Sequence, residues 1–113
     1  LLCGGQIEQL GGGLYLRPTV LADVTPDMAV MTDETFGPVI PVTLFDTVEE
    51  ALMLANSGVF GLSGAVLAGT DGEASAVGRW LNVGAVSVND GALTSMVWDA
   101  EKSSFGLSGM GPS

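Results

Sequence analysis

The stretch VIPVTLFDTVEEALMLANSG, residues 39–58, changes its hydrophobic pattern halfway along, and this change decides the fold. Residues 39–45 are rich in β-branched side chains and almost continuously apolar, which is typical of a strand covered on both faces. Thr47 and Glu50 then form a capping box, in which each side chain can accept a hydrogen bond from the other residue's free backbone N–H. Apolar residues follow at helical spacing until Asn56, so the stretch predicts a strand followed by a helix.

The residues that follow repeat this arrangement. Residues 62–68 resemble a strand, Thr70 and Glu73 form a second capping box, and a helical pattern continues until Gly84. Residues 85–89 then read as a third short strand. The series predicts an α/β fold with a βαβαβ-type, mostly parallel sheet and flanking helices.

The two ends of the chain are less regular. Gly11, Gly12 and Gly13 predict a turn between two extended segments, because glycine adopts positive φ at no steric cost. Pro18 keeps the extended residues 14–21 away from a central sheet position, since proline cannot donate to a strand ladder. We expect a connection at residues 23–31 and a loop over residues 90–113, where Gly and Ser are frequent.

Length and charge exclude several classes of function. The 113 residues fit one domain, which we take as a single unit over 1–113, and 47% of them are hydrophobic. The net charge is −10 with only three basic residues, so neither nucleic acid nor an anionic membrane surface is expected as a partner. The chain has no His and a single Cys, which favours a reducing cytoplasm.

No targeting or membrane segment is expected. The span from Ala51 to Thr70 is uncharged, but helix breakers and polar residues interrupt its middle. Residues 1–3 lack the basic region of a signal peptide. Because the sequence opens on Leu1 rather than Met, we also expect it to be an excerpt of a longer chain.

Three common kinds of site are not favoured. Cys3 has no His to activate it, so we do not expect it to be a nucleophile. The carboxylates are scattered without metal-ligand spacing, so no metal site is predicted. The glycines of residues 106–111 lack the strand-to-helix setting of a phosphate-binding loop.

The stretch from Asp33 to Pro38, DETFGP, is the best candidate site. Its plain interpretation is a polar turn in which the proline starts the next strand. The Glu34 carboxylate could instead accept hydrogen bonds from two neighbouring sugar hydroxyls, and the Phe36 ring could provide an apolar wall for a heteroaromatic ring. Gly37 would allow close approach of the backbone. Such a cluster could hold a nucleoside.

Segments spread over the whole chain match, in order, the motifs of one enzyme family. The most specific is residues 31–42, MTDETFGPVIPV, which is similar to the motif EE-[IT]-FGPV-x-PV. The chain therefore resembles the aldehyde dehydrogenase superfamily. The other matching segments are residues 5–23 (G…PTVL.DV in the family), 49–56 (EA…AN), 61–63 (YGLSA), 82–89 (aG.v.vN) and 108–111 (SG.G).

The resemblance implies a function for the candidate site. Members oxidise an aldehyde to a carboxylic acid through a thioester on a Cys and pass hydride to NAD or NADP. Glu34 would stand for the family Glu that binds the nicotinamide ribose, and Phe36 for the ring against which the nicotinamide end packs. The chain would be the C-terminal portion of the catalytic domain, without the N-terminal cofactor-binding region, of a parent that is a homo-oligomer.

Departures from the family pattern limit what this chain can do. No segment matches the GQ-x-C setting of the nucleophile, so the nucleophile and the general base are expected upstream and the isolated chain is expected to be inactive. The late GG-x-K-x-SG motif reads SSFGLSG at residues 103–109, which lacks the glycine pair and the lysine. Two alternatives stay open: a small acidic α/β interaction module without catalysis, and an acyl-CoA or acyl-phosphate reductase of the same superfamily.

Overall fold

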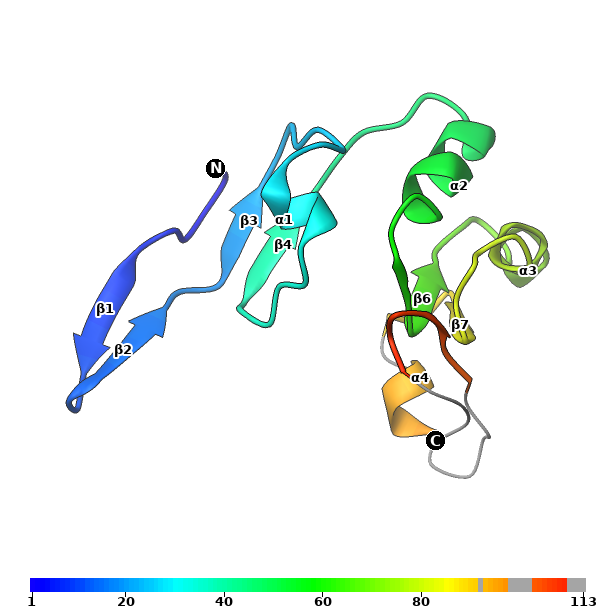
Figure 1. The fold of residues 1–113 in the computed structure, drawn as a ribbon. Helices are drawn as coiled ribbons and strands as arrows, with labels where there is room; N and C mark the ends of the chain where they lie inside the picture. The colour runs from blue at the N-terminus through cyan, green and yellow to red at the C-terminus, as the bar shows by residue number, and fades with distance from the viewer. Residues whose placement is uncertain (92, 98–102, 110–113) are drawn as a thin grey trace. The chain divides into compact units, whose positions relative to one another are not determined.

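The computed structural model describes residues 1–91, 93–97 and 103–109 (Figure 1). The chain divides into two compact units, Leu1–Phe45 and Asp46–Ser113, which we call the first and second unit. Both units combine short strands and helices, so the predicted α/β class is confirmed. Each unit is built on its own strand pairs.

The first unit begins with a β-hairpin. Strands β1 (Ile7–Leu10) and β2 (Gly13–Leu16) pair in antiparallel register, with Ile7 opposite Leu16. The turn between them consists of Gly11 and Gly12, at φ 57° and 86°. Two successive positive φ angles give a turn whose twist matches that of the flanking strands. The turn predicted from the glycines is confirmed.

A parallel strand pair follows the hairpin. Strand β3 (Thr19–Leu21) pairs with β4 (Val39–Pro41), and Pro18 lies between β2 and β3, where no ladder N–H is needed. Helix α1 (Ala29–Thr32) lies in the crossover, so residues 23–31 are not only the connection that the sequence predicts. Its N-cap residue, Met28, makes no side-chain capping bond, and a single uncapped turn leaves little signal in a sequence.

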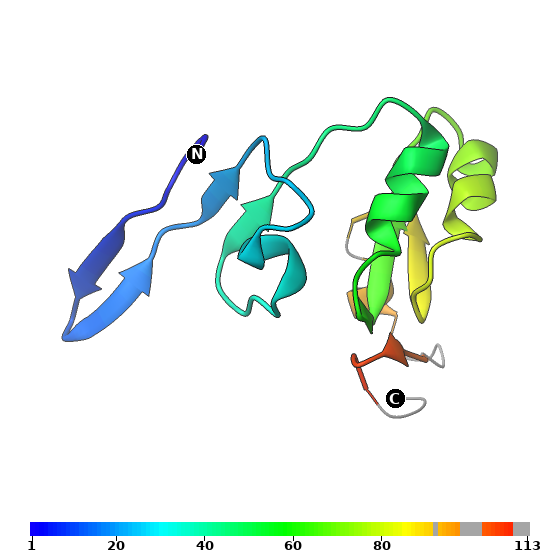
Figure 2. The same ribbon diagram turned by 45° about the horizontal axis from the view of Figure 1, so that its top comes forward.

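The second unit contains the βαβ crossover that the sequence predicts. Strands β6 (Ser63–Val66) and β7 (Ala85–Val88) pair in parallel, with helix α3 (Asp71–Gly78) between them in the chain. Helix α2 (Val48–Ala55) precedes β5 (Phe60–Gly61), and Figure 2 shows α2 and α3 beside the β6–β7 pair. The earlier crossover, from β4 through α2 to β6, links the two units and stays a prediction.

Both long helices begin at the predicted capping boxes. The N–H of Glu50 donates to Oγ1 of Thr47, and the N–H of Glu73 donates to Oγ1 of Thr70, each at 3.2 Å. The return bonds differ from the simple pattern. Oε2 of Glu50 accepts from the N–H of Asp46 at 2.8 Å, whereas Oε2 of Glu73 accepts from the Thr70 hydroxyl at 3.1 Å. The boxes fix where the helices start.

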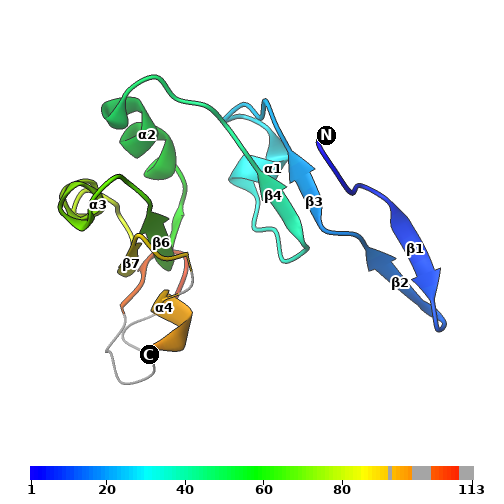
Figure 3. The same ribbon diagram turned by 180° about the vertical axis from the view of Figure 1, so that it is seen from behind.

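The last part of the chain is more structured than predicted. Within the range expected to be loop, α4 (Leu93–Met96) contacts β7, and β8 (Phe105–Gly106) pairs in antiparallel with β5. The N–H of Thr94 donates to Oγ of the buried Ser87 at 3.2 Å, which docks α4 on β7. Figure 3 shows α4 and β7 from behind. A one-turn helix and a two-residue strand are too short to show periodicity in a sequence.

The core of the described residues is small. Only Val24 and Ala74 are fully buried apolar side chains in that part of the chain, and α2 has no buried residue although it carries an apolar stripe. Large apolar side chains remain exposed instead; Leu14 is 77% exposed and Leu44 81%. Exposure of so many large apolar side chains is typical of a polypeptide whose surface is partly covered by another.

The span from Ala51 to Thr70 is divided among α2, β5 and β6, as its helix breakers predict. None of the helices in the described part of the chain has the length and hydropathy needed to cross a bilayer.

Candidate functional site

Residues 33–38 connect α1 to β4 and are anchored at both ends. The N–H of Asp33 donates to the carbonyl of Ala29 at 2.9 Å and so closes the helix. At the other end, the carbonyl of Pro38 accepts from the N–H of Thr19 at 2.8 Å, which ties the stretch to β3. Residues 34–36 lie between these anchors and carry the predicted site.

Glu34 and Phe36 are both exposed. The Phe36 ring is 93% exposed, so it belongs to no core within this chain. No hydrogen bond to the Glu34 carboxylate is found in the described residues, whereas Oδ1 of the neighbouring Asp33 accepts from the Thr32 hydroxyl at 3.1 Å. Of the two adjacent acids, Glu34 is therefore the one with both oxygens available to a ligand.

The position of the stretch in the sheet is not the usual one for a ligand. It precedes β4, so it lies at the amino end of the parallel β3–β4 pair. Ligands of open α/β sheets usually bind outside the carboxyl ends of the strands. Topology alone would not suggest this stretch as a candidate site; the residue types of the sequence and the family motif do.

Cys3 lies away from this stretch in the chain and is free and exposed. Its carbonyl accepts from the N–H of Val20 at 3.1 Å, an isolated bridge that holds the N-terminal residues against β3. Among the described residues, no three acidic or Cys side chains are grouped closely enough to hold a metal ion.

The described part of the late glycine segment is bound within the second unit. The N–H of Leu107 donates to the carbonyl of Val59 at 2.8 Å, and Oγ of Ser108 accepts from the N–H of Gly61 at 2.8 Å. These bonds dock residues 105–108 on β5. The rest of the segment, residues 110–111, lies outside the described residues.

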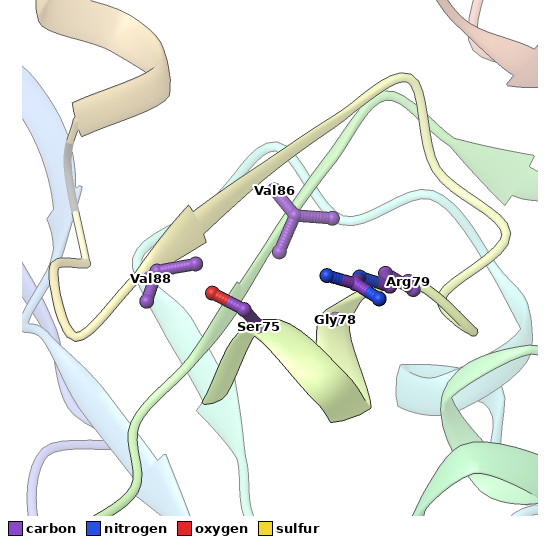
Figure 4. A pocket seen from close by; sticks show the side chains of 5 residues that line it. All are labelled: Ser75, Gly78, Arg79, Val86 and Val88. Atoms are coloured by element: carbon purple, nitrogen blue, oxygen red, sulfur yellow. The ribbon is translucent and has the colours of Figure 1, made fainter. Parts of the chain in front are cut away.

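One feature of the second unit was not predicted from the sequence. An open groove of about 410 Å³ lies between α3 and β7, lined by Ser75, Gly78, Arg79, Val86 and Val88 (Figure 4). A glycine inside a predicted helix was the only sequence signal that could have suggested it, because glycine lets a helix approach its sheet closely.

Known proteins resemble this chain along nearly its whole length. The family model described as "Aldehyde dehydrogenase family" matches residues 1–112. The chain belongs to the aldehyde dehydrogenase family. The mitochondrial succinate-semialdehyde dehydrogenase of Rattus norvegicus is 42% identical over 96 residues, which are 85% of this chain and 18% of that protein. The chloroplastic betaine aldehyde dehydrogenase of Atriplex hortensis is 44% identical over 90 residues, 79% of this chain and 18% of that one.

Solved structures of this family share the fold. PutA from Anabaena variabilis has a TM-score of 0.92 and 55% identity, over 98% of this chain and 24% of that one. Betaine aldehyde dehydrogenase from Staphylococcus aureus, solved in complex with NAD+, has a TM-score of 0.85 and 34% identity, over 98% of this chain and 22% of that one. The chain thus spans about a fifth of the length of the curated aldehyde dehydrogenases that it matches.

Proposed function

We propose that residues 1–113 form the C-terminal portion of the catalytic domain of an NAD(P)-dependent aldehyde dehydrogenase, and that Glu34 and Phe36 bind the nicotinamide end of the coenzyme. The observation that carries the proposal is the family match over residues 1–112, together with the exposure of both side chains. The two compact units are then parts of one domain whose remaining walls come from the rest of the polypeptide.

The residues present fit a nicotinamide nucleoside. An unengaged carboxylate can accept one hydrogen bond on each oxygen from neighbouring ribose hydroxyls, and charge-assisted bonds of this kind are about twice as strong as neutral ones. The Phe36 ring offers a flat apolar surface on which a nicotinamide can pack. Because residue 33 and Pro38 are held by backbone hydrogen bonds, the two side chains project from a stretch with fixed ends.

These residues bind and orient; they do not react. The coenzyme, when bound, accepts a hydride from the substrate. Glu34 fixes the ribose and Phe36 limits tilting of the ring, so that the hydride acceptor is presented in one orientation. The nucleophile and the general base lie upstream of this region, and Cys3 does not take the role of the nucleophile.

The parent protein has the further properties expected of the family. Several solved structures similar to this chain contain NAD+, which supports NAD as the coenzyme, with NADP as the alternative. The substrate is an aldehyde, the product is a carboxylic acid, and the parent is a homo-oligomer. A single free thiol and no disulfide are compatible with a reducing cytoplasm, although some relatives are mitochondrial or chloroplastic proteins.

Two alternative functions were considered from the sequence. A non-catalytic interaction module finds no support in a family match of this extent. An acyl-CoA or acyl-phosphate reductase would use the same coenzyme stretch and differ in the upstream thiol pocket, so it is a choice between substrates and not between sites.

The test is a chimera in which residues 1–112 replace the matching segment of the S. aureus betaine aldehyde dehydrogenase. We expect a folded oligomer that binds NAD+ and forms NADH with betaine aldehyde, with the unchanged host as reference. A chimera that elutes and melts like the host but binds no NAD+ would overturn the proposal for residues 33–38.

A second test uses the chain alone. We expect no aldehyde-dependent formation of NAD(P)H, because the nucleophile is supplied from elsewhere. Turnover that persists in a Cys3→Ala variant would show that the chain contains a catalytic group that the proposal does not include.

A further inference from the structure

Thr19 connects three segments of the first unit. It lies at the start of β3 and is buried, with 4% of its surface exposed. Its hydroxyl donates to the carbonyl of Arg17 at 2.7 Å and accepts from the N–H of Gly5 at 2.8 Å. Its backbone N–H donates to the carbonyl of Pro38 at 2.8 Å. Thr19 therefore joins the N-terminal residues, its own strand and the end of residues 33–38.

Strand β3 is held along both of its edges. On one edge, the N–H of Leu2 donates to the carbonyl of Val20 at 2.8 Å, and the N–H of Val20 donates to the carbonyl of Cys3 at 3.1 Å. On the other edge lies β4, so β3 stands between β4 and the N-terminal residues (Figure 1). A shift of the start of β3 would therefore displace the carbonyl of Pro38, which is the anchored end of residues 33–38.

Two glycines let the N-terminal residues come close to Thr19. Gly4 and Gly5 have φ angles of 75° and 76°, a conformation that other residues rarely adopt. A Cβ atom at Gly4 would overlap the carbonyl oxygen of Pro18 and lie 2.7 Å from Oγ1 of Thr19. A Cβ atom at Gly5 would have its nearest neighbours in the flexible side chain of Leu1, the first at 3.1 Å. The contact at Gly4 thus leaves no space for a side chain.

We propose that Thr19 is a positioning residue for the coenzyme contacts of Glu34 and Phe36. Its hydroxyl fixes the start of β3, and its N–H holds the carbonyl of Pro38, two residues beyond Phe36. Thr19 is buried and acts through residues 33–38, not by touching the coenzyme. Because hydrogen bonds weaken steeply when their geometry is poor, coenzyme affinity should report a shift of this anchor. The inference rests on the proposed function, since it concerns how the two side chains are held.

The first test compares Thr19→Val with Thr19→Ser in the chimera with S. aureus betaine aldehyde dehydrogenase. Valine has nearly the size of threonine but no hydroxyl, whereas serine keeps the hydroxyl. We expect Thr19→Val to raise the KM for NAD+ about fivefold, the loss typical of one hydrogen bond, with a smaller change in kcat. Thr19→Ser should stay within about twofold of the unchanged chimera. An unaltered KM in Thr19→Val would overturn the proposal.

A double variant separates positioning from a general loss of stability. Glu34→Gln alone should raise the KM for NAD+ roughly tenfold, so independent effects would multiply to about fiftyfold when it is combined with Thr19→Val. If Thr19 acts through Glu34, the combined increase should be only about fifteenfold. A fiftyfold increase would refute the positioning role and leave the coenzyme site intact. If Glu34→Gln alone has no effect, the proposed function fails, and this inference fails with it.

A pair of glycine variants gives a second perturbation, so the proposal stays testable if Thr19→Val does not fold. Gly4→Ala and Gly5→Ala place a side chain at nearly the same positive φ, but the new methyl group meets Thr19 only at residue 4. Gly4→Ala should raise the KM for NAD+ about fivefold or more, because it pushes the N-terminal residues away from the hydroxyl. Gly5→Ala should keep the KM within about twofold. Equal increases in the two variants would contradict a specific contact at Thr19.

Discussion

The substitution Glu34→Gln tests the proposed coenzyme contact most directly. It preserves the size of the side chain but removes the charge and one of the two acceptor oxygens. Because the Glu34 carboxylate forms no hydrogen bond within the described residues, the substitution breaks no contact on which the fold depends. Its effect should therefore appear in coenzyme binding rather than in stability.

The expected magnitude follows from the number of bonds lost. Replacing a charge-assisted hydrogen bond typically costs about 1.5–3 kcal/mol, and the exposure of Glu34 favours the lower end, so we expect the KM for NAD+ to rise roughly tenfold. The assay is steady-state NADH formation by the chimera with betaine aldehyde at saturation. If Glu34 only holds the ribose, kcat should change less than KM.

Asp33→Asn is the matched control, because it removes the adjacent charge from a carboxylate that is already engaged by Thr32. It should leave the KM for NAD+ within about twofold, as expected for a surface substitution outside a binding contact. Equal increases in KM for the two variants would refute the argument, since they would indicate a general effect of negative charge instead of a specific contact at residue 34.

Four further predictions can be checked with the same proteins. Phe36→Leu in the chimera should raise the KM for NAD+ about threefold, because a lost aromatic contact costs roughly 0.5–1.5 kcal/mol; an unchanged KM would remove Phe36 from the site. The isolated chain should bind a hydrophobic dye and self-associate, as its exposed apolar side chains require, and a stable monomer without dye binding would contradict this. Asn56→Ala should speed amide hydrogen exchange at Asn82 about fivefold. Oδ1 of Asn56 accepts a hydrogen bond from that N–H at 2.7 Å, and such a bond contributes about 1 kcal/mol. Exchange at an unaltered rate would contradict this prediction. Thr25→Ala should raise the pKa of Asp27 in a carboxyl NMR titration, because the Thr25 hydroxyl donates to this carboxylate and holds its pKa below the usual range. The stability that this hydrogen bond adds is present above the ordinary pKa of Asp and is lost as the pH falls through the lowered value.

Capping boxes and turn glycines in the sequence were sufficient to predict the two long helices and the hairpin turn. Thr47 and Thr70 start their helices as predicted, because a capping box is completed by residues three positions apart. The Gly11–Gly12 turn was likewise readable, since only residues that tolerate positive φ form it. Helix α1 and strand β8 were missed because neither has a cap or a period, and long-range pairing defines β8.

For the candidate site, too, the sequence indicated some features and only the structure showed others. The chemistry of Glu34 and Phe36, a carboxylate and a ring two residues apart, made them candidates for holding a nucleoside, and similarity to related chains then suggested which part of the coenzyme they bind. The structure adds that both side chains are exposed and that the neighbouring Asp33 is engaged, which a sequence cannot show. By contrast, the groove at Arg79 was absent from the sequence interpretation, because its lining comes from a helix and a strand that only the crossover brings together.

By itself, the sequence determined the α/β class, the starts of the two capped helices, the hairpin turn and the family, because each of these depends on residues close together in the chain or on motifs in a fixed order. Only the tertiary structure decided that β4 joins β3, that β8 joins β5, and which apolar side chains remain uncovered. The physical reason is that strand pairing and burial depend on contacts between segments distant in sequence. Apolar periodicity shows that a face needs a partner but does not specify which one.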